Sequence, residues 1–127
     1  MIIADTSFLV AFYHEIDPNH NNALDLMQKH EKEGLLISDY VFGETATVLL
    51  YKKKLEISLK FMKRAEETES VKLLKISEED FHKIIDVYKN QKYQLSFIDA
   101  SIIYLARTMN LDVLSFDGNI QKELNTR

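Results

Sequence analysis

Short apolar runs alternate with longer amphipathic stretches along the chain. The runs at residues 2–4 and 35–37 are predicted to be buried strands, and those at residues 71–76 and 113–115 to be a third and a fourth strand. Helical spacing of apolar residues predicts helices over residues 18–34, 39–53, 56–68, 78–90 and 97–109, with a short helix at the end of the chain. Strands that alternate with helices of ten or more residues favour an α/β fold, in which helices cover both faces of a parallel sheet.

Polar residues in front of several apolar stretches mark where helices should begin. Asp17 followed by Pro18 is typical of an N-cap with proline in the first helical position. Ser77 and Ser96 are predicted to cap the helices that follow them, and Asp80 is placed to complete a capping box with Ser77.

The composition excludes several classes of site and suits one domain over residues 1–127. With no cysteine, the chain has no disulfide, thiolate zinc site or cysteine nucleophile. Its 3 glycines stand far apart, which excludes phosphate-binding and dinucleotide-binding glycine loops. No apolar stretch approaches the ~18 residues of a membrane span, and no signal peptide is recognisable. We therefore expect a soluble cytoplasmic domain.

Basic side chains gather in residues 52–64, although the formal net charge of the chain is -4. The six are Lys52, Lys53, Lys54, Lys60, Lys63 and Arg64. The overall charge argues against a broad nucleic-acid-binding surface. The segment is either a solvated helix face or a stripe that follows the phosphates of an RNA backbone, and composition does not choose between them.

Two aspartates stand at the ends of predicted strands. Asp5 ends the strand at residues 2–4, and Asp117 lies just beyond the strand at residues 113–115. Parallel strands place both at one rim of the sheet, where ligands of open α/β sheets bind. Capping a helix is the alternative role for each of them, because aspartate is common at turns and N-caps.

Glu44 and Asp99 interrupt apolar helix faces. The other members of these faces are Tyr40, Val41, Val48 and Tyr51 around Glu44, and Ile102, Ile103 and Ala106 around Asp99. A buried carboxylate is costly unless it is protonated, paired or bound to a cation. A salt bridge from Glu44 to a lysine such as Lys52, and a helix-dipole role for Asp99 after Ser96, are the structural alternatives.

The four acids Asp5, Glu44, Asp99 and Asp117 are expected to converge on one rim of the sheet. Carboxylates around one cavity repel each other unless cations lie among them. Oxygen ligands without histidine or cysteine favour Mg²⁺ or Mn²⁺ over zinc. Such a site suits phosphodiester hydrolysis. Thr6 and Ser7 are expected to cap the next helix and to orient Asp5.

Four segments, in this order, resemble the PIN-domain family and particularly the small VapC-type toxins of prokaryotic toxin–antitoxin pairs. They are residues 2–7 (IIADTS), 38–44 (SDYVFGE), 97–102 (FIDASI) and 113–117 (VLSFD). The resemblance implies a three-layer α/β/α sandwich with a mostly parallel sheet of four to five strands. It also implies a ribonuclease acting on RNA, with Mg²⁺ or Mn²⁺ held by Asp5, Glu44, Asp99 and Asp117, an orienting role for Ser115, and a homodimer.

The same resemblance implies a cognate antitoxin protein as a partner. We expect this partner to send an arginine toward Asp5 and Asp99, since a guanidinium binds carboxylates bidentately. The apolar groove for the partner is expected to be formed by Phe8, Phe12, Tyr40, Phe42 and Tyr51.

The sequence does not choose between a toxin and an RNA-processing nuclease, and other classes of function fit it less well. A PIN nuclease that processes RNA outside a toxin pair shares every motif. A receiver-type signalling module would need a lysine after the last strand, where Ser115 and Asp117 stand instead. A haloacid-dehalogenase-type phosphatase would need a second aspartate at position 7, which is serine. A non-catalytic binding module also remains open, because a site does not by itself guarantee turnover.

Overall fold

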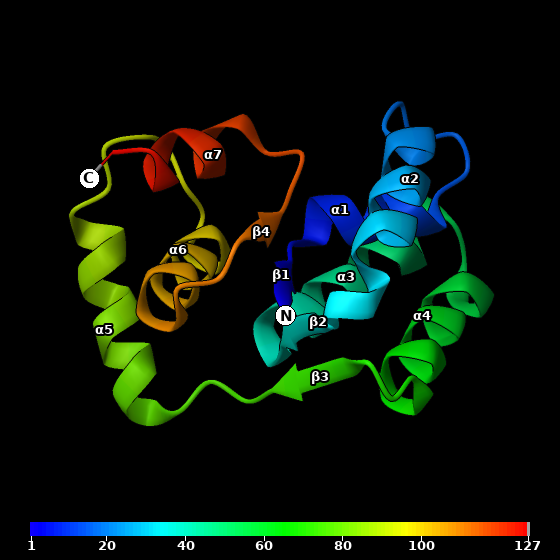
Figure 1. The fold of residues 1–127 in the computed structure, drawn as a ribbon, viewed down its shortest axis with the longest axis horizontal. Helices are drawn as coiled ribbons and strands as arrows, with labels where there is room; N and C mark the ends of the chain where they lie inside the picture. Colours follow the sequence, from blue (N-terminus) through cyan, green and yellow to red (C-terminus); the bar gives the residue numbers. More distant parts are fainter. Residues whose placement is uncertain (127) are drawn as a thin grey trace.

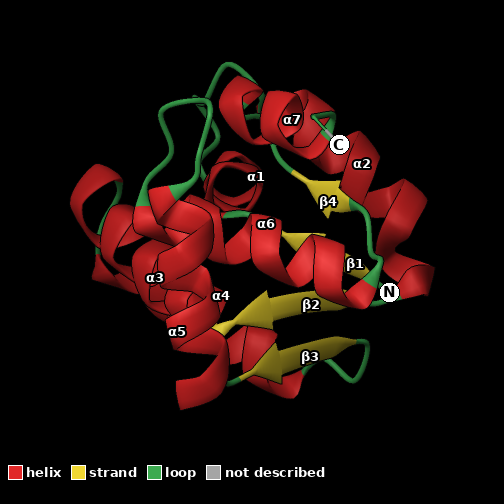
Figure 2. Cartoon of the chain, turned by 90° about the vertical axis from the view of Figure 1, so that its left-hand side faces the viewer, coloured by secondary structure: helices red, strands yellow, loops and turns green. Residues whose placement is uncertain are grey.

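The computed structural model describes residues 1–126, which are built around a parallel sheet of four strands. The strands are β1 (Ile2–Ala4), β2 (Leu35–Ser38), β3 (Val71–Leu74) and β4 (Val113–Leu114), and they lie in the order β3-β2-β1-β4 (Figure 2). In the register, Ile2 faces Leu35 and Ile3 faces Val113. Arg127, the last residue of the single domain expected over residues 1–127, lies outside the described residues.

Helices cover both faces of this sheet. They are α1 (Thr6–Tyr13), α2 (His20–His30), α3 (Asp39–Lys52), α4 (Leu55–Glu67), α5 (Glu78–Lys89), α6 (Phe97–Met109) and α7 (Gly118–Leu124), with a single 3₁₀ turn, η1 (Glu31–Glu33), after α2. In Figure 1, α5 and α6 lie on one side of the sheet, and α1, α2 and α4 lie on the other. The expected α/β/α sandwich with a parallel sheet is confirmed.

The core explains why β1 and β2 are apolar at consecutive positions. Every residue of β1 and β2 is buried, because helices cover the sheet on both faces. Ile3 and Leu36 of these strands share the core with Ile102 and Ile103 of α6. Within residues 1–126, no helix has the length and apolar character needed to cross a lipid bilayer.

The beginning of α2 differs from the prediction. Asn19, not Asp17, is the N-cap residue, and it makes no side-chain capping bond. The Asp17 carboxylate instead accepts a hydrogen bond from the Asn19 N–H at 2.8 Å, which satisfies that group before the helix begins. Asp17 and Asn19 therefore belong to the connection between α1 and α2.

The turn between η1 and β2 depends on Gly34, which has a φ of 84°. This left-handed backbone is unfavourable for residues with a Cβ atom. A Cβ atom at this position would also lie 2.9 Å from the carbonyl oxygen of Ser70. Gly34 thus allows the chain to enter β2 close beside the turn that precedes β3.

The strand order creates the position of the site. After β1, the chain adds β2 and β3 on one side of it and later returns to add β4 on the other side. Because all four strands are parallel, their carboxyl ends lie at the same edge of the sheet. In open α/β sheets, ligands bind at this edge, where the strand order reverses. Here the reversal lies beside β1, directly before Asp5.

Candidate active site

Asp5 follows β1 and is held at three points. It is 2% exposed and is the N-cap residue of α1, where its Oδ1 accepts a hydrogen bond from the Thr6 N–H at 2.7 Å. Its Oδ2 accepts hydrogen bonds from the hydroxyls of Ser7 and Ser115, both at 2.7 Å. The Asp5 carboxylate is therefore fixed by β1, α1 and the segment after β4.

Burial raises the pKa of Asp5, and the negative charge of Asp99 raises it further. The hydrogen bonds from Ser115, Ser7 and Thr6 act in the opposite direction, because they stabilise the ionised carboxylate. The net result is a pKa above its usual range. A cation beside Asp5 would favour the ionised form.

The serines also connect the two strand ends with each other. Ser7 Oγ accepts a hydrogen bond from the Phe116 N–H at 2.9 Å, and Ser115 Oγ accepts one from the Asp117 N–H at 3.0 Å. Thr6 and Ser7 are not the caps of the next helix, as was expected, since they are its first two residues and Asp5 caps it. The Thr6 hydroxyl is buried and has no partner within residues 1–126.

Glu44 lies in the middle of α3 on a half-buried strip beside the core. The fully buried face of α3 is formed by Val41, Thr45 and Leu49. No residue in the described part of the chain donates a hydrogen bond or forms an ion pair with the Glu44 carboxylate, so the alternative of a salt bridge to Lys52 is not realised. Glu44 is thus an unpaired acid at the margin of the core.

Asp99 stabilises the start of α6, which was the structural alternative considered for it because it follows Ser96. Ser96 caps α6 through the Asp99 N–H at 3.1 Å, and Asp99 Oδ2 accepts the Ser96 N–H in return, also at 3.1 Å. Burial raises the pKa of Asp99, and the charges of Asp117 and Glu44 add to this, against the hydrogen bonds with Ser96. By contrast, Ser77 and Asp80 do not form the predicted capping box: the Asp80 carboxylate instead accepts the Tyr104 hydroxyl.

Asp117 begins α7 as its N-cap residue. Its Oδ1 accepts hydrogen bonds from the N–H groups of Asn119 and Ile120, at 2.8 and 3.2 Å. Its Oδ2 accepts none from residues 1–126. Asp117 therefore caps a helix and still keeps one carboxylate oxygen that accepts no hydrogen bond from residues 1–126, as Asp99 does.

All four predicted acids line one cleft of about 450 Å³ at the carboxyl edge of the sheet. Asp17, Asn19 and Lys52 line it as well, and its apolar walls are Val10, Val48 and Phe116. Asp17 and Asn19 were not predicted as site residues, because the connection after α1 has no helix or strand periodicity from which its position could be derived. The predicted aromatic groove is wrong: none of its five members lines the cleft, Phe8 is fully buried, and Tyr51 is 82% exposed.

The cleft has the donor chemistry for a hard divalent cation, although the carboxylates are not drawn together around one. Within residues 1–126, no three Asp, Glu, His or Cys side chains lie in an arrangement that could hold a metal ion as they stand. Uncompensated like charges keep such groups apart. Oxygens remain available on Glu44, Asp99 and Asp117, and an all-oxygen set suits Mg²⁺ or Mn²⁺. The donor atoms of these residues therefore suit such an ion in kind, although their present arrangement does not surround one.

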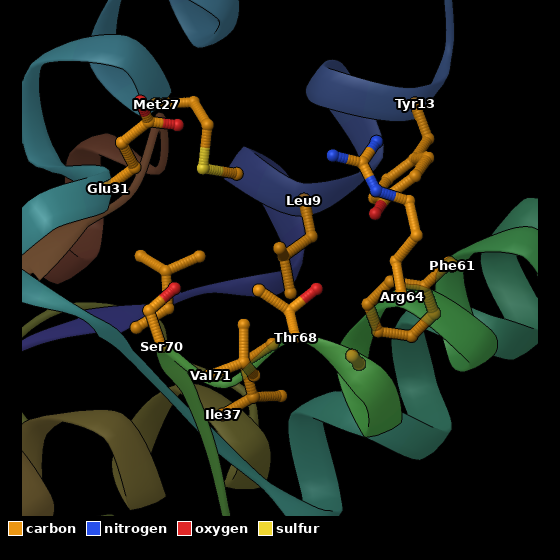
Figure 3. A pocket seen from close by; sticks show the side chains of 12 residues that line it. Leu9, Tyr13, Met27, Glu31, Ile37, Phe61, Arg64, Thr68, Ser70 and Val71 are labelled. Carbon is orange, nitrogen blue, oxygen red and sulfur yellow. The ribbon is translucent and has the colours of Figure 1, made fainter.

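The basic residues of the 52–64 segment do not lie on one helix. Lys52 is the last residue of α3, Lys53 and Lys54 connect it to α4, and Lys60, Lys63 and Arg64 belong to α4. The Arg64 guanidinium lies over the rings of Phe12 and Tyr13, at 5.6 and 5.7 Å from their centroids. It lines a different hollow, together with Leu9, Met27 and Phe61 (Figure 3).

A family model described as "PIN domain" matches residues 2–124. A search of curated protein sequences finds no significant match. Among solved structures, the chain is similar to Mycobacterium tuberculosis VapC20, described as a sarcin–ricin loop cleaving toxin, with 19% identity and a TM-score of 0.85 over 96% of this chain and 94% of that one.

Two further solved structures have the same fold. FitAcB from Neisseria gonorrhoeae is 16% identical, with a TM-score of 0.70 over 98% of this chain and 94% of that one. VapBC2 from Rickettsia felis, bound to a DNA fragment of its promoter, is 16% identical, with a TM-score of 0.66 over 97% of this chain and 93% of that one.

Proposed function

The chain belongs to the PIN-domain family, a family of nucleases, and we propose that it is a Mg²⁺- or Mn²⁺-dependent endoribonuclease. The observation that carries this proposal is the cleft in which Asp5, Glu44, Asp99 and Asp117 meet without a compensating salt bridge. The charges of these acids support it, because Asp99 raises the pKa of Asp5, and Asp117 and Glu44 raise the pKa of Asp99.

In this proposal, Asp5 and Asp99 are direct metal ligands, and Glu44 and Asp117 complete the site directly or through water. A bound divalent cation would supply a hydroxide at neutral pH and stabilise the leaving oxygen of the phosphodiester. Ser7 and Ser115 are positioning residues, since their hydroxyls fix the Asp5 carboxylate at 2.7 Å. The Thr6 N–H has the same effect on the other carboxylate oxygen.

Cleavage of single-stranded RNA by the wild type and by Asp5→Asn tests the proposal. Asp5→Asn removes one charge with little change in shape, so cleavage in Mg²⁺ or Mn²⁺ should fall by at least ~100-fold. Circular dichroism of the variant controls for folding. Undiminished cleavage by folded Asp5→Asn, or by the wild type in EDTA, would overturn the proposal.

We further propose that the chain is the toxin of a toxin–antitoxin pair, with a cognate antitoxin that inhibits it. The similarity to VapC20, FitAcB and VapBC2 supports this setting. An arginine of the partner would find its acceptors on Asp99, whose Oδ1 accepts no hydrogen bond from residues 1–126, and on Asp5, whose Oδ1 accepts only the one from the Thr6 N–H. Arginine would then compete with Mg²⁺ for the cleft.

Growth assays test this setting separately from the chemistry. Expression of the chain alone should slow growth, and co-expression of the small protein encoded beside it should restore growth. Inhibition of the purified nuclease by that protein should weaken as Mg²⁺ rises. Harmless expression of folded, RNA-cleaving protein would instead favour a role in RNA processing. We also infer a homodimer from the family, which analytical ultracentrifugation would test.

A further inference from the structure

Lys52 differs from the other basic residues of the 52–64 segment. In the described part of the chain, it is the one lysine or arginine among the side chains that line the acidic cleft. Five carboxylates line the same cleft, those of Asp5, Asp17, Glu44, Asp99 and Asp117. None of the ion pairs between residues 1–126 includes Lys52. Its ammonium group is therefore available to an anion that enters the cleft.

The helix places Lys52 on the same side as Glu44. Glu44, Val48 and Lys52 are four residues apart on α3, and all three line the cleft. The rise of an α-helix separates the backbones of Glu44 and Lys52 by about 12 Å. The Cα–Cβ bonds of a helix tilt toward its N-terminus, which for Lys52 is the direction of Val48 and Glu44. Lys52 is exposed as well as lining the cleft, so it lies at the mouth of the cleft.

An RNA strand that approaches this cleft meets repulsion between its phosphates and the carboxylates. A divalent cation would neutralise part of this charge among the acids, but phosphates on either side of the cleaved bond remain uncompensated. Resting on the function proposed above, we propose that Lys52 binds an RNA phosphate at the mouth of the cleft and so positions the strand across the carboxylates. An ammonium group suits this role as a compact charge with three donors.

The rest of the basic segment is arranged for other contacts. The Arg64 guanidinium lies over the rings of Phe12 and Tyr13. It lines a separate hollow (Figure 3). Lys63 lines another hollow with Leu59 and Met62 on α4. Neither lines the cleft, so the 52–64 segment is not one continuous stripe along the acids. The inference concerns Lys52 alone.

The test measures RNA binding apart from cleavage. A short, fluorescein-labelled single-stranded RNA of mixed sequence is titrated with wild type, Lys52→Ala, Lys52→Arg and Lys89→Ala, with Ca²⁺ in place of Mg²⁺ and over a series of salt concentrations. Lys89 is the matched control, because it is an exposed lysine in the last turn of α5 and does not line the cleft. Thermal melting of each variant reports any loss of helix stability.

Lys52→Ala should weaken binding about tenfold, as expected for one charge-assisted contact. The slope of log K against log salt should become shallower by about 0.7, the contribution of one phosphate on a single strand. Lys52→Arg should restore most of the slope, and Lys89→Ala should match the wild type. An unchanged slope for Lys52→Ala, or an equal loss for Lys89→Ala, would overturn the inference.

The same experiment separates this inference from the proposed nuclease function. If the wild type binds RNA but does not cleave it in Mg²⁺ or Mn²⁺, the nuclease proposal fails, and the salt slope still decides on Lys52. If the wild type cleaves RNA but Lys52→Ala binds as the wild type does, the Lys52 inference alone fails. If the wild type does not bind RNA, both fail.

Discussion

Three of the four acids in the cleft also stabilise the start of a helix, and Glu44 does not. Asp5, Asp99 and Asp117 each accept a backbone N–H at the start of a helix, which ties their position in the cleft to local folding. Glu44 accepts no hydrogen bond from residues 1–126. Its charge repels that of Asp99 with no compensating contact, so Glu44 is expected to lower the stability of the metal-free protein.

We predict that Glu44→Gln stabilises the protein in EDTA and weakens its binding of Mg²⁺. Removal of one like charge from the cleft relieves repulsion with Asp99, which should raise Tm by about 2–4 °C. Differential scanning fluorimetry with and without Mg²⁺ measures both effects. Glu15→Gln is the control, because Glu15 is exposed in a loop and lies outside the cleft. A lower Tm for Glu44→Gln in EDTA would contradict the prediction.

Among single residues, those whose position follows from a strand end or a helix face could be predicted from the sequence. Asp5 and Asp117 follow strands, and Glu44 and Asp99 interrupt apolar stripes, so each could be identified. Asp17 could not, because its place in the cleft depends on the path of a loop. The mispredicted groove had the same origin: helical spacing places Tyr51 near Glu44, but it does not reveal that this end of α3 faces solvent.

A serine side chain caps α3, α5 and α6, and the caps of α5 and α6 differ in whether the capped residue lines the cleft. Ser77 Oγ accepts the Asp80 N–H at the start of α5, and Ser96 Oγ accepts the Asp99 N–H at the start of α6, both at 3.1 Å. Only the second cap holds a residue of the cleft. The pair allows the stability of a helix end to be separated from its effect on the site.

We predict that Ser96→Ala lowers both stability and RNA cleavage, whereas Ser77→Ala lowers stability alone. Loss of either cap should cost ~1 kcal/mol. Ser96→Ala keeps the backbone N–H that bonds Asp99 Oδ2 but removes the acceptor of the Asp99 N–H. The first turn of α6, which carries Asp99, should then be less firmly held, so cleavage should fall several-fold and the Mg²⁺ requirement should rise. Chemical denaturation and initial cleavage rates at several Mg²⁺ concentrations measure the two effects. Equal cleavage by both variants would refute the link between the cap and the site.

The elements themselves were predictable wherever periodicity and caps agreed. The helices after Ser77 and Ser96 begin at the expected residues, since serine caps are local signals. A helix after Thr6 and Ser7 was expected, but the bounds of α1 were not predicted. Phe8, Leu9, Val10 and Ala11 are all buried, so this short helix has no polar face and no amphipathic period. Its presence follows from the sheet and helices that surround it, which is tertiary information.

The whole chain is needed to assemble the cleft. Asp5 comes from the beginning of the sequence and Asp117 from its end, and they meet because β4 pairs with β1. Alternating strands and helices predicted the parallel sheet, but they did not determine the order in which the strands lie. That order places the segment after β4, and with it Ser115, beside Asp5. The C-terminal part of the chain must therefore pack against the rest of the protein for the cleft to form.

Glu123 is one of the residues that attach this part to the rest of the protein. It is 5% exposed, near the end of α7, and its carboxylate accepts hydrogen bonds from the Lys92 N–H at 2.9 Å and the Thr126 hydroxyl at 3.2 Å. The Arg107 guanidinium of α6 lies 3.8 Å away. Burial raises the pKa of Glu123, but the N–H groups of Lys92 and Tyr93, the Thr126 hydroxyl and Arg107 outweigh it and bring the pKa below its ordinary value.

We predict that Glu123→Gln destabilises the protein in a manner that depends on pH. Because the folded pKa lies below the ordinary value of 4.5, ionised Glu123 stabilises the folded chain above that pH, and this stabilisation is lost as the pH falls through the folded pKa. The Tm of Glu123→Gln should thus lie several degrees below that of the wild type at pH 7, and the difference should narrow below pH ~4.5. Taking the difference between the two proteins at each pH cancels the titration of the acids in the cleft, which both contain. A Tm difference that stays constant from neutral to acidic pH would show that the charge of Glu123 does not hold α7 in place.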